Sequence, residues 1–211
     1  MSYDLEEQDQ IEQLRAFWQR WGNLISLLAL AAALSWAGYT GWQWWSNRQA
    51  AQAAQLYGKL SQDLQATDLH NAAPVWAALQ NEHAATPYSA MAGLALARAQ
   101  ADAGQGDAAI QTLNWVVGHA GDSAYQAAAR LDLAALQMDS HQLDAALTSV
   151  KSAPAPEFEA LFAMRRGDIY ALQGDNAQAR SAYQQALSLL PPASSYRQLL
   201  QFKLDSVGGQ A

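Results

Sequence analysis

The sequence predicts an all-α protein with one N-terminal transmembrane helix followed by an array of helical hairpins. Alanine accounts for 46 of the 211 residues, whereas Ile and Val together contribute 9. Helices favour Ala and strands favour β-branched residues, so a β-rich fold is nearly excluded. An uncharged apolar segment lies near the N-terminus, and small residues recur further along at intervals of 37 and 33 residues.

The composition also excludes several classes of function. The chain has no Cys, so disulfide frameworks, thiolate zinc sites and cysteine catalysis are ruled out. Its net charge of −7 argues against nucleic acid as a partner, which would require a basic face. No histidine pair has zinc-like spacing and no nucleophile motif is present, so we expect no enzyme activity, metal, cofactor or small-molecule substrate. The four histidines are interpreted as turn or surface residues: His70, His83, His119 and His141.

Residues 21–46 are predicted to form a transmembrane helix. No charge occurs between Arg20 and Arg48, and about 20 apolar residues suffice to cross the hydrocarbon core. Six of the eight Trp lie between residues 18 and 45. Trp21 stands at one end of the segment and Trp42, Trp44 and Trp45 at the other, as in aromatic belts. A cleaved signal peptide and a buried soluble helix are the alternatives. The acidic tail over residues 1–20 disfavours the first, since secretory signals begin with basic residues.

Charge does not orient this segment, because basic residues flank both sides equally. A short cytoplasmic tail and a large domain outside is the favoured arrangement. Small residues recur every fourth position along the segment, which would let another membrane helix approach closely. Chance in an Ala-rich segment is the alternative explanation for this stripe, which comprises Ala29, Ala33, Ala37 and Gly41.

Residues 47–211 contain a recurring hairpin pattern. The clearest copy matches the second half of the tetratricopeptide signature, with Tyr in place of Phe: Gly167, Tyr170, Ala179, Tyr183 and Pro191. Small residues at Gly167 and Ala179 would let two antiparallel helices touch, and the tyrosines would fill the seam between them. The first half of the signature is absent, because Ala163 and Arg166 stand where Trp and Leu are usual.

Aligning upstream copies on the seam alanine predicts three repeats. Ala109, Ala146 and Ala179 are spaced by 37 and 33 residues, and the repeats are expected over residues 89–121, 124–155 and 160–193. A long helix over 47–66 and a second starting near Pro74 could form a further, degenerate hairpin. A terminal helix over 194–207 is expected to cap the array with a solvated face.

The first helices of such hairpins line the concave face of an array. An apolar, methionine-bearing face suits an amphipathic or unfolded protein segment. Two alternatives remain open: the terminal helix fills this face, or the assumed helical register is wrong by one residue. The expected binding residues are Met91, Leu94, Arg98, Leu131, Met138, Leu161 and Met164.

The order of these parts is similar to that of the YfgM family of Gram-negative inner-membrane proteins. The resemblance covers nearly the whole chain. The Trp-rich span, the altered last repeat and the Ala-rich domain depart from the family. The resemblance rests on these segments in order: Asp9-Gln10-Ile11-Glu12, Leu14-Arg15-Ala16-Phe17-Trp18, Gly41-Trp42-Gln43-Trp44-Trp45-Ser46, Ala54-Gln55-Leu56-Tyr57, Thr86-Pro87-Tyr88-Ser89-Ala90, Arg166-Gly167-Asp168, Gly174-Asp175 and Ala179-Arg180-Ser181-Ala182-Tyr183.

The resemblance implies a single-pass inner-membrane protein with a cytoplasmic N-terminus and a periplasmic repeat domain. It implies a non-enzymatic, chaperone-like ancillary subunit of the SecYEG translocon that acts with a PpiD-like chaperone in handing over secreted proteins. Two alternative functions stay open. One is a general adaptor in envelope assembly or cell division, and the other is a regulator of an envelope stress response through the cytoplasmic tail.

Overall fold

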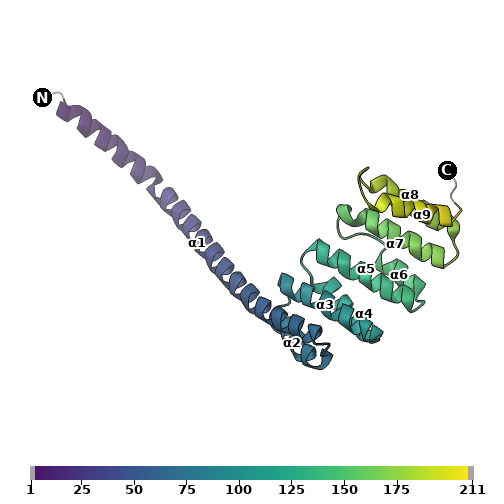
Figure 1. The fold of residues 1–211 in the computed structure, drawn as a ribbon. Coiled ribbons are helices and arrows are strands. Elements are labelled where there is room, and N and C mark those ends of the chain that lie inside the picture. The colour runs from purple at the N-terminus through teal and green to yellow at the C-terminus, as the bar shows by residue number, and fades with distance from the viewer. Residues whose placement is uncertain (1–2, 209–211) are drawn as a thin grey trace. The chain divides into compact units, whose positions relative to one another are not determined.

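The computed structural model describes residues 3–208, which form helices and contain no strand (Figure 1). The predicted all-α class is therefore confirmed. The chain divides into two compact units between Arg48 and Gln49, and each is described by itself. The ends of the expected tail and terminal segment, residues 1–2 and 209–211, lie outside the described part.

The N-terminal unit consists of a single helical segment that belongs to α1 (Tyr3–Gln65). Within the described residues, α1 is the one helix long and apolar enough to cross a membrane. Its large apolar side chains are exposed, among them Leu34 and Trp36. The Arg48 guanidinium lies 5.4 Å from the centre of the Trp44 ring, a cation–π contact typical of an interfacial anchor.

The helix expected over residues 47–66 is not separate, because it is the C-terminal part of α1. Residues 47–65 are rich in Ala, Gln and Leu and contain no Pro, so nothing in this stretch ends the helix. The remaining helices follow in antiparallel order (Figure 1): α2 (Leu69–Glu82), α3 (Pro87–Asp102), α4 (Gly106–His119), α5 (Ser123–Asp139), α6 (Leu143–Ser149), the 3-10 turn η1 (Pro156–Phe158), α7 (Glu159–Leu172), α8 (Asn176–Leu189) and α9 (Tyr196–Ser206).

Four hairpins share one turn geometry. In each turn a residue with positive φ follows the first helix: Thr67 (58°), Gly104 (75°), His141 (59°) and Gly174 (78°). The N–H of the next residue donates to a carbonyl five residues back, at 2.7–2.9 Å. This pairing is the Schellman motif, which satisfies the last carbonyls of a helix. The turns are spaced by 37, 37 and 33 residues.

The same spacing recurs in the seam between the helices of each pair. The alanine five residues after each turn residue has no exposed surface: Ala72, Ala109, Ala146 and Ala179. The C-terminal part of α1 and α2 therefore form a fourth hairpin, a point that the sequence left open. Pro74 lies inside α2 rather than at its start, because the Asp68 carboxylate already caps the helix by accepting the Asn71 N–H at 3.0 Å.

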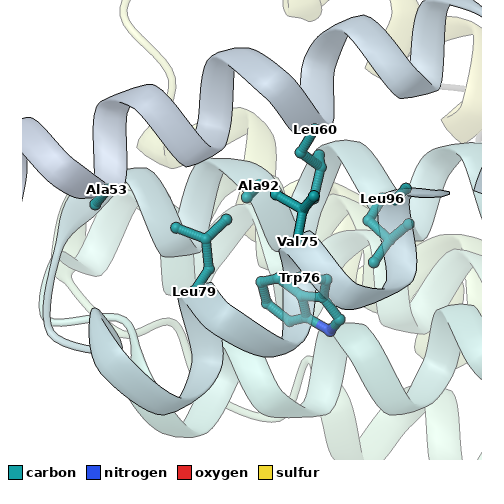
Figure 2. Packing of buried hydrophobic residues seen from close by; sticks show 8 residues of the cluster. Ala53, Leu60, Val75, Trp76, Leu79, Ala92 and Leu96 are labelled. Carbon is teal, nitrogen blue, oxygen red and sulfur yellow. The ribbon is translucent and has the colours of Figure 1, made fainter.

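Figure 2 shows how this first hairpin joins the next one. Leu60 of α1, Val75 and Leu79 of α2 and Leu96 of α3 converge in one buried cluster, with the Trp76 indole beside them. The Trp76 ring meets Trp115 of α4 edge-on, with 4.9 Å between ring centres. Each hairpin thus completes its core with side chains of its neighbour, as in other helical arrays.

The third hairpin, formed by α5 and α6, is shorter than the repeat expected over residues 124–155. Helix α6 ends at Ser149, and the following segment contains Pro154 and Pro156, which disfavour further helix. The Arg166 guanidinium satisfies a backbone carbonyl left without a helical partner at the end of α6: it donates to the Val150 oxygen at 3.0 Å. It also pairs with the Glu159 carboxylate at 2.6 Å. This contact explains why Arg replaces the usual Leu of the signature.

Helix α9 covers the end of the array. Leu200 and Val207 are buried in a cluster with Tyr183, and Lys203 Nζ lies 2.6 Å from Asp168 Oδ1. The Tyr183 hydroxyl donates to the same oxygen at 2.8 Å. Burial and the adjacent Asp168 raise the pKa of the Tyr183 phenol, so it stays a donor. The outer face of α9 is mixed: Tyr196, Leu199 and Phe202 are exposed beside the polar residues Gln198, Gln201 and Asp205.

Gly167→Ala is expected to lower the free energy of unfolding by about 1–3 kcal/mol, the usual cost of overpacking. A Cβ at this position would overlap the Tyr183 ring. Urea denaturation of the full chain in detergent, followed by circular dichroism, measures the change. Gly118→Ala is the control, because its Cβ would meet nothing within 4 Å in the last turn of α4. Equal stability of the two variants would contradict the close approach at Gly167.

Arg166→Leu, which restores the signature residue, is expected to destabilise the chain by about 2–3 kcal/mol, because charged hydrogen bonds are lost. The Arg166 side chain is only 14% exposed. Arg98→Leu removes an ion pair whose side chains are 81% and 64% exposed and should cost less than about 0.5 kcal/mol. The same denaturation assay compares them, and a stabilised Arg166→Leu variant would contradict the capping role.

Candidate functional site

The exposed apolar face expected on the first helices does not form as predicted. Leu94, Leu131, Met138 and Met164 are half-buried and pack against core clusters. Met91 and Leu161 are also half-buried, and Arg98 alone among the seven expected binding residues is exposed. These side chains serve the contacts between neighbouring hairpins, so most of their apolar surface is already covered.

The last repeat shows why the face is closed there. Met164 and Ala171 of α7 pack against the cluster that contains Leu200 and Val207 from the end of the chain. Asp168, on the same helix, is bound by Lys203 of α9. The alternative in which the terminal helix fills the face therefore describes this part of the array.

A pocket of about 290 Å³ opens between the first helices of two middle hairpins, α3 and α5. We call it the α3–α5 pocket. Buried apolar side chains such as Ala97 and Leu113 form its inner part, whereas charged, exposed side chains stand at its edge. It is lined by Ala97, Arg98, Ala101, Asp102, Leu113, Asp132, Ala135, Leu136 and Asp139.

Only some of the charged side chains of this pocket form an ion pair. Arg98 Nε lies 3.2 Å from Asp102 Oδ2. Asp132 and Asp139 have neither a side-chain hydrogen bond nor an ion pair with any described residue. Burial raises the pKa of Asp132, and the positive charges of Arg165 and Arg98 only partly offset this effect. The pocket therefore holds an excess of negative charge.

The helical register explains how the sequence interpretation missed these carboxylates. Asp132 and Asp139 each follow a residue of the expected face, Leu131 and Met138, by one position. Arg98 is the one expected binding residue that lines the α3–α5 pocket, and its binding role stays a prediction. On α5 the predicted exposed residues are therefore off by one position, and the exposed surface is acidic where an apolar one was expected. The seven-residue spacing of the two aspartates, two helical turns on one face, was the signal available in the sequence.

The described residues contain no group of His, Asp or Glu side chains that could hold a metal ion. His83 is a turn residue but is buried, with its Nδ1 2.5 Å from Gln49 Oε1. His119 stacks on Trp115 with 4.4 Å between ring centres. Both histidines therefore have structural contacts within the array.

The small-residue stripe in the N-terminal unit lies open. Ala29, Ala33, Ala37 and Gly41 are all exposed, and a Cβ at Gly41 would meet nothing within 4 Å. The surface is shaped for close approach of another helix. Packing against a partner stays a prediction.

Comparison with known proteins identifies the family of this chain. The family model described as a tetratricopeptide repeat-like domain matches residues 15–209. The chain belongs to this family. The Ancillary SecYEG translocon subunit of Neisseria gonorrhoeae (strain ATCC 700825 / FA 1090) is 33% identical over 213 residues, which cover 98% of this chain and 100% of that relative. The resemblance to the YfgM family is thus confirmed.

Asp132→Asn is expected to raise the free energy of unfolding at neutral pH by less than about 1 kcal/mol, because the carboxyl keeps contact with solvent. Since burial raises its pKa in the folded chain, the ionised form is disfavoured there. The free-energy cost of ionising Asp132 in the folded chain is absent at a pH below the pKa that this carboxyl has in the unfolded chain. It develops as the pH rises through the pKa of the same carboxyl in the folded chain.

Urea denaturation of the full chain at neutral and acidic pH measures this effect. The stabilisation by Asp132→Asn should vanish at a pH where the carboxyl is protonated in both states. Asp205→Asn is the control, because Asp205 is exposed on α9 outside the pocket. A loss of stability in Asp132→Asn at neutral pH would show that the carboxylate is satisfied in the folded chain.

Proposed function

We propose that this chain is a non-enzymatic, membrane-anchored ancillary subunit of the SecYEG translocon. The observation that carries the proposal is a relationship along the whole chain. The relative named as such a subunit is matched over its full length and over 98% of this chain. The match therefore takes in both the apolar segment of α1 and the hairpin array.

The apolar part of α1 supports the membrane part of this proposal. Its Leu and Trp side chains are exposed rather than packed in a protein core, and hydrocarbon is the medium that suits them. In our proposal this segment spans the inner membrane once, with residues 1–20 in the cytoplasm and residues 47–211 in the periplasm. The absence of Cys is compatible with an oxidising compartment.

The hairpin array supports a role in protein binding. Helical arrays present extended surfaces built from successive first helices, and the α3–α5 pocket lies on this kind of surface. We propose that the array works with a PpiD-like chaperone in handing over secreted proteins. The stripe of Ala29, Ala33, Ala37 and Gly41 would hold the membrane helix against the translocon through close packing.

Co-purification from membranes tests the translocon assignment. Full-length chain, tagged at its C-terminus and extracted in mild detergent, should recover SecYEG and a PpiD-like chaperone. Ala33→Leu combined with Ala37→Leu should lower SecYEG recovery by about three- to tenfold, because the larger side chains separate the helices.

Ala31→Leu combined with Ser35→Leu is the matched control, because these positions lie on the opposite face of the same helix. Its SecYEG recovery should equal that of the unmodified chain. If the unmodified chain recovers envelope-assembly proteins without SecYEG, the adaptor function replaces the translocon assignment. Protease digestion of the C-terminal domain in spheroplasts tests the orientation, and resistance to digestion would contradict a periplasmic array.

A further inference from the structure

The α3–α5 pocket has two chemically distinct zones. Ala97 and Leu113 are almost fully buried at its inner side, and Leu136 adds a half-buried apolar surface. Asp132 and Asp139 stand exposed at its edge. A ligand that fills this pocket should therefore carry an apolar portion that ends in a polar or charged group.

The charge at the edge selects a cation. Three aspartates and one arginine line the pocket, and Arg98 is bound to Asp102. Asp132 and Asp139 have no side-chain hydrogen bond or ion pair with any described residue, although Arg165 and Arg98 lie near Asp132. They stand on one face of α5, roughly 10 Å apart along the helix axis. Carboxylates disfavour an anionic group such as the C-terminus of a partner, and the described residues offer no metal-binding cluster. An organic cation is the complementary ligand.

The size of the pocket fits one side chain. Sites for drug-sized molecules begin at about 300 Å³, and this pocket measures about 290 Å³. Lys and Arg have methylene stems that lie along apolar surface while the charged end stays in contact with solvent or a carboxylate. These side chains match both zones, whereas a small inorganic cation would leave the apolar zone unused.

We propose that the α3–α5 pocket binds a lysine or arginine side chain of an extended segment of a partner polypeptide. The inference rests on the proposed function, since a subunit at the translocon meets extended polypeptides. It deepens that function by assigning the segment a basic residue and by assigning Asp132 and Asp139 as the groups that select it.

Fluorescence anisotropy with full-length chain in detergent micelles tests the proposal. The probes are two short, flexible, fluorescein-labelled peptides of Gly, Ser and Leu that differ only in one central residue, Lys or Gln. The unmodified chain should bind the Lys peptide about three- to tenfold more tightly, the range expected for a partly exposed charge pair. Asp132→Asn combined with Asp139→Asn should abolish this preference and leave Gln-peptide binding unchanged.

Asp205→Asn combined with Glu157→Gln is the matched control, because it removes two negative charges from exposed positions outside the pocket. This variant should keep the Lys preference. Circular dichroism confirms that both double variants are folded. The proposal is overturned if the unmodified chain binds both peptides equally, or if the control loses the preference to the same extent.

Two further measurements identify the occupant. If the unmodified chain is a dimer that Asp132→Asn dissociates, a second copy occupies the pocket and the proposal of a partner segment is wrong. SecYEG recovery by the Asp132→Asn and Asp139→Asn variant should equal that of the unmodified chain. Normal recovery without any Lys preference would overturn only the pocket assignment, whereas a Lys preference without SecYEG recovery supports the pocket and overturns only the translocon proposal.

Discussion

Close approach of antiparallel helices is the constraint on which the array depends. Each of the four hairpins places an alanine without exposed surface at the same step after its turn, and in the last pair Gly167 lies so close to the Tyr183 ring that a Cβ would overlap it. Small side chains bring the two backbones together, and larger ones then fill the space at the edges of each seam. The high alanine content is a direct consequence of this packing.

The fold could be predicted in outline because its signals are local. Seam alanines, glycine turns and an uncharged apolar segment each lie within a few residues of the structure they specify. The existence of the first hairpin could not be decided from the sequence, because Thr67 occupies the turn position with positive φ where a glycine would have indicated a turn. The early end of α6 was missed because its compensation comes from Arg166, which lies in the next hairpin.

The candidate pocket was harder to predict because it depends on side-chain direction rather than on helix position. A shift of one residue moves the exposed direction of a helix by roughly 100°, enough to exchange Leu131 for Asp132. Arg98 was identified because an Arg in an apolar surface stands out in any register. The spacing of the two aspartates places them on one face of α5, but only the tertiary structure shows that the neighbouring α3 leaves this face open.

The order of contacts along the array has a consequence for its biogenesis. The helix pairs with substantial contacts are neighbours in the chain or one helix apart, so no element waits for a distant part of the sequence. Such low contact order favours fast folding and allows each hairpin to dock as synthesis delivers it. The first hairpin closes once the turn after Gln65 and α2 are available, and α9 docks last. A stalled or truncated chain would therefore expose one seam at its newest end rather than a dispersed apolar surface.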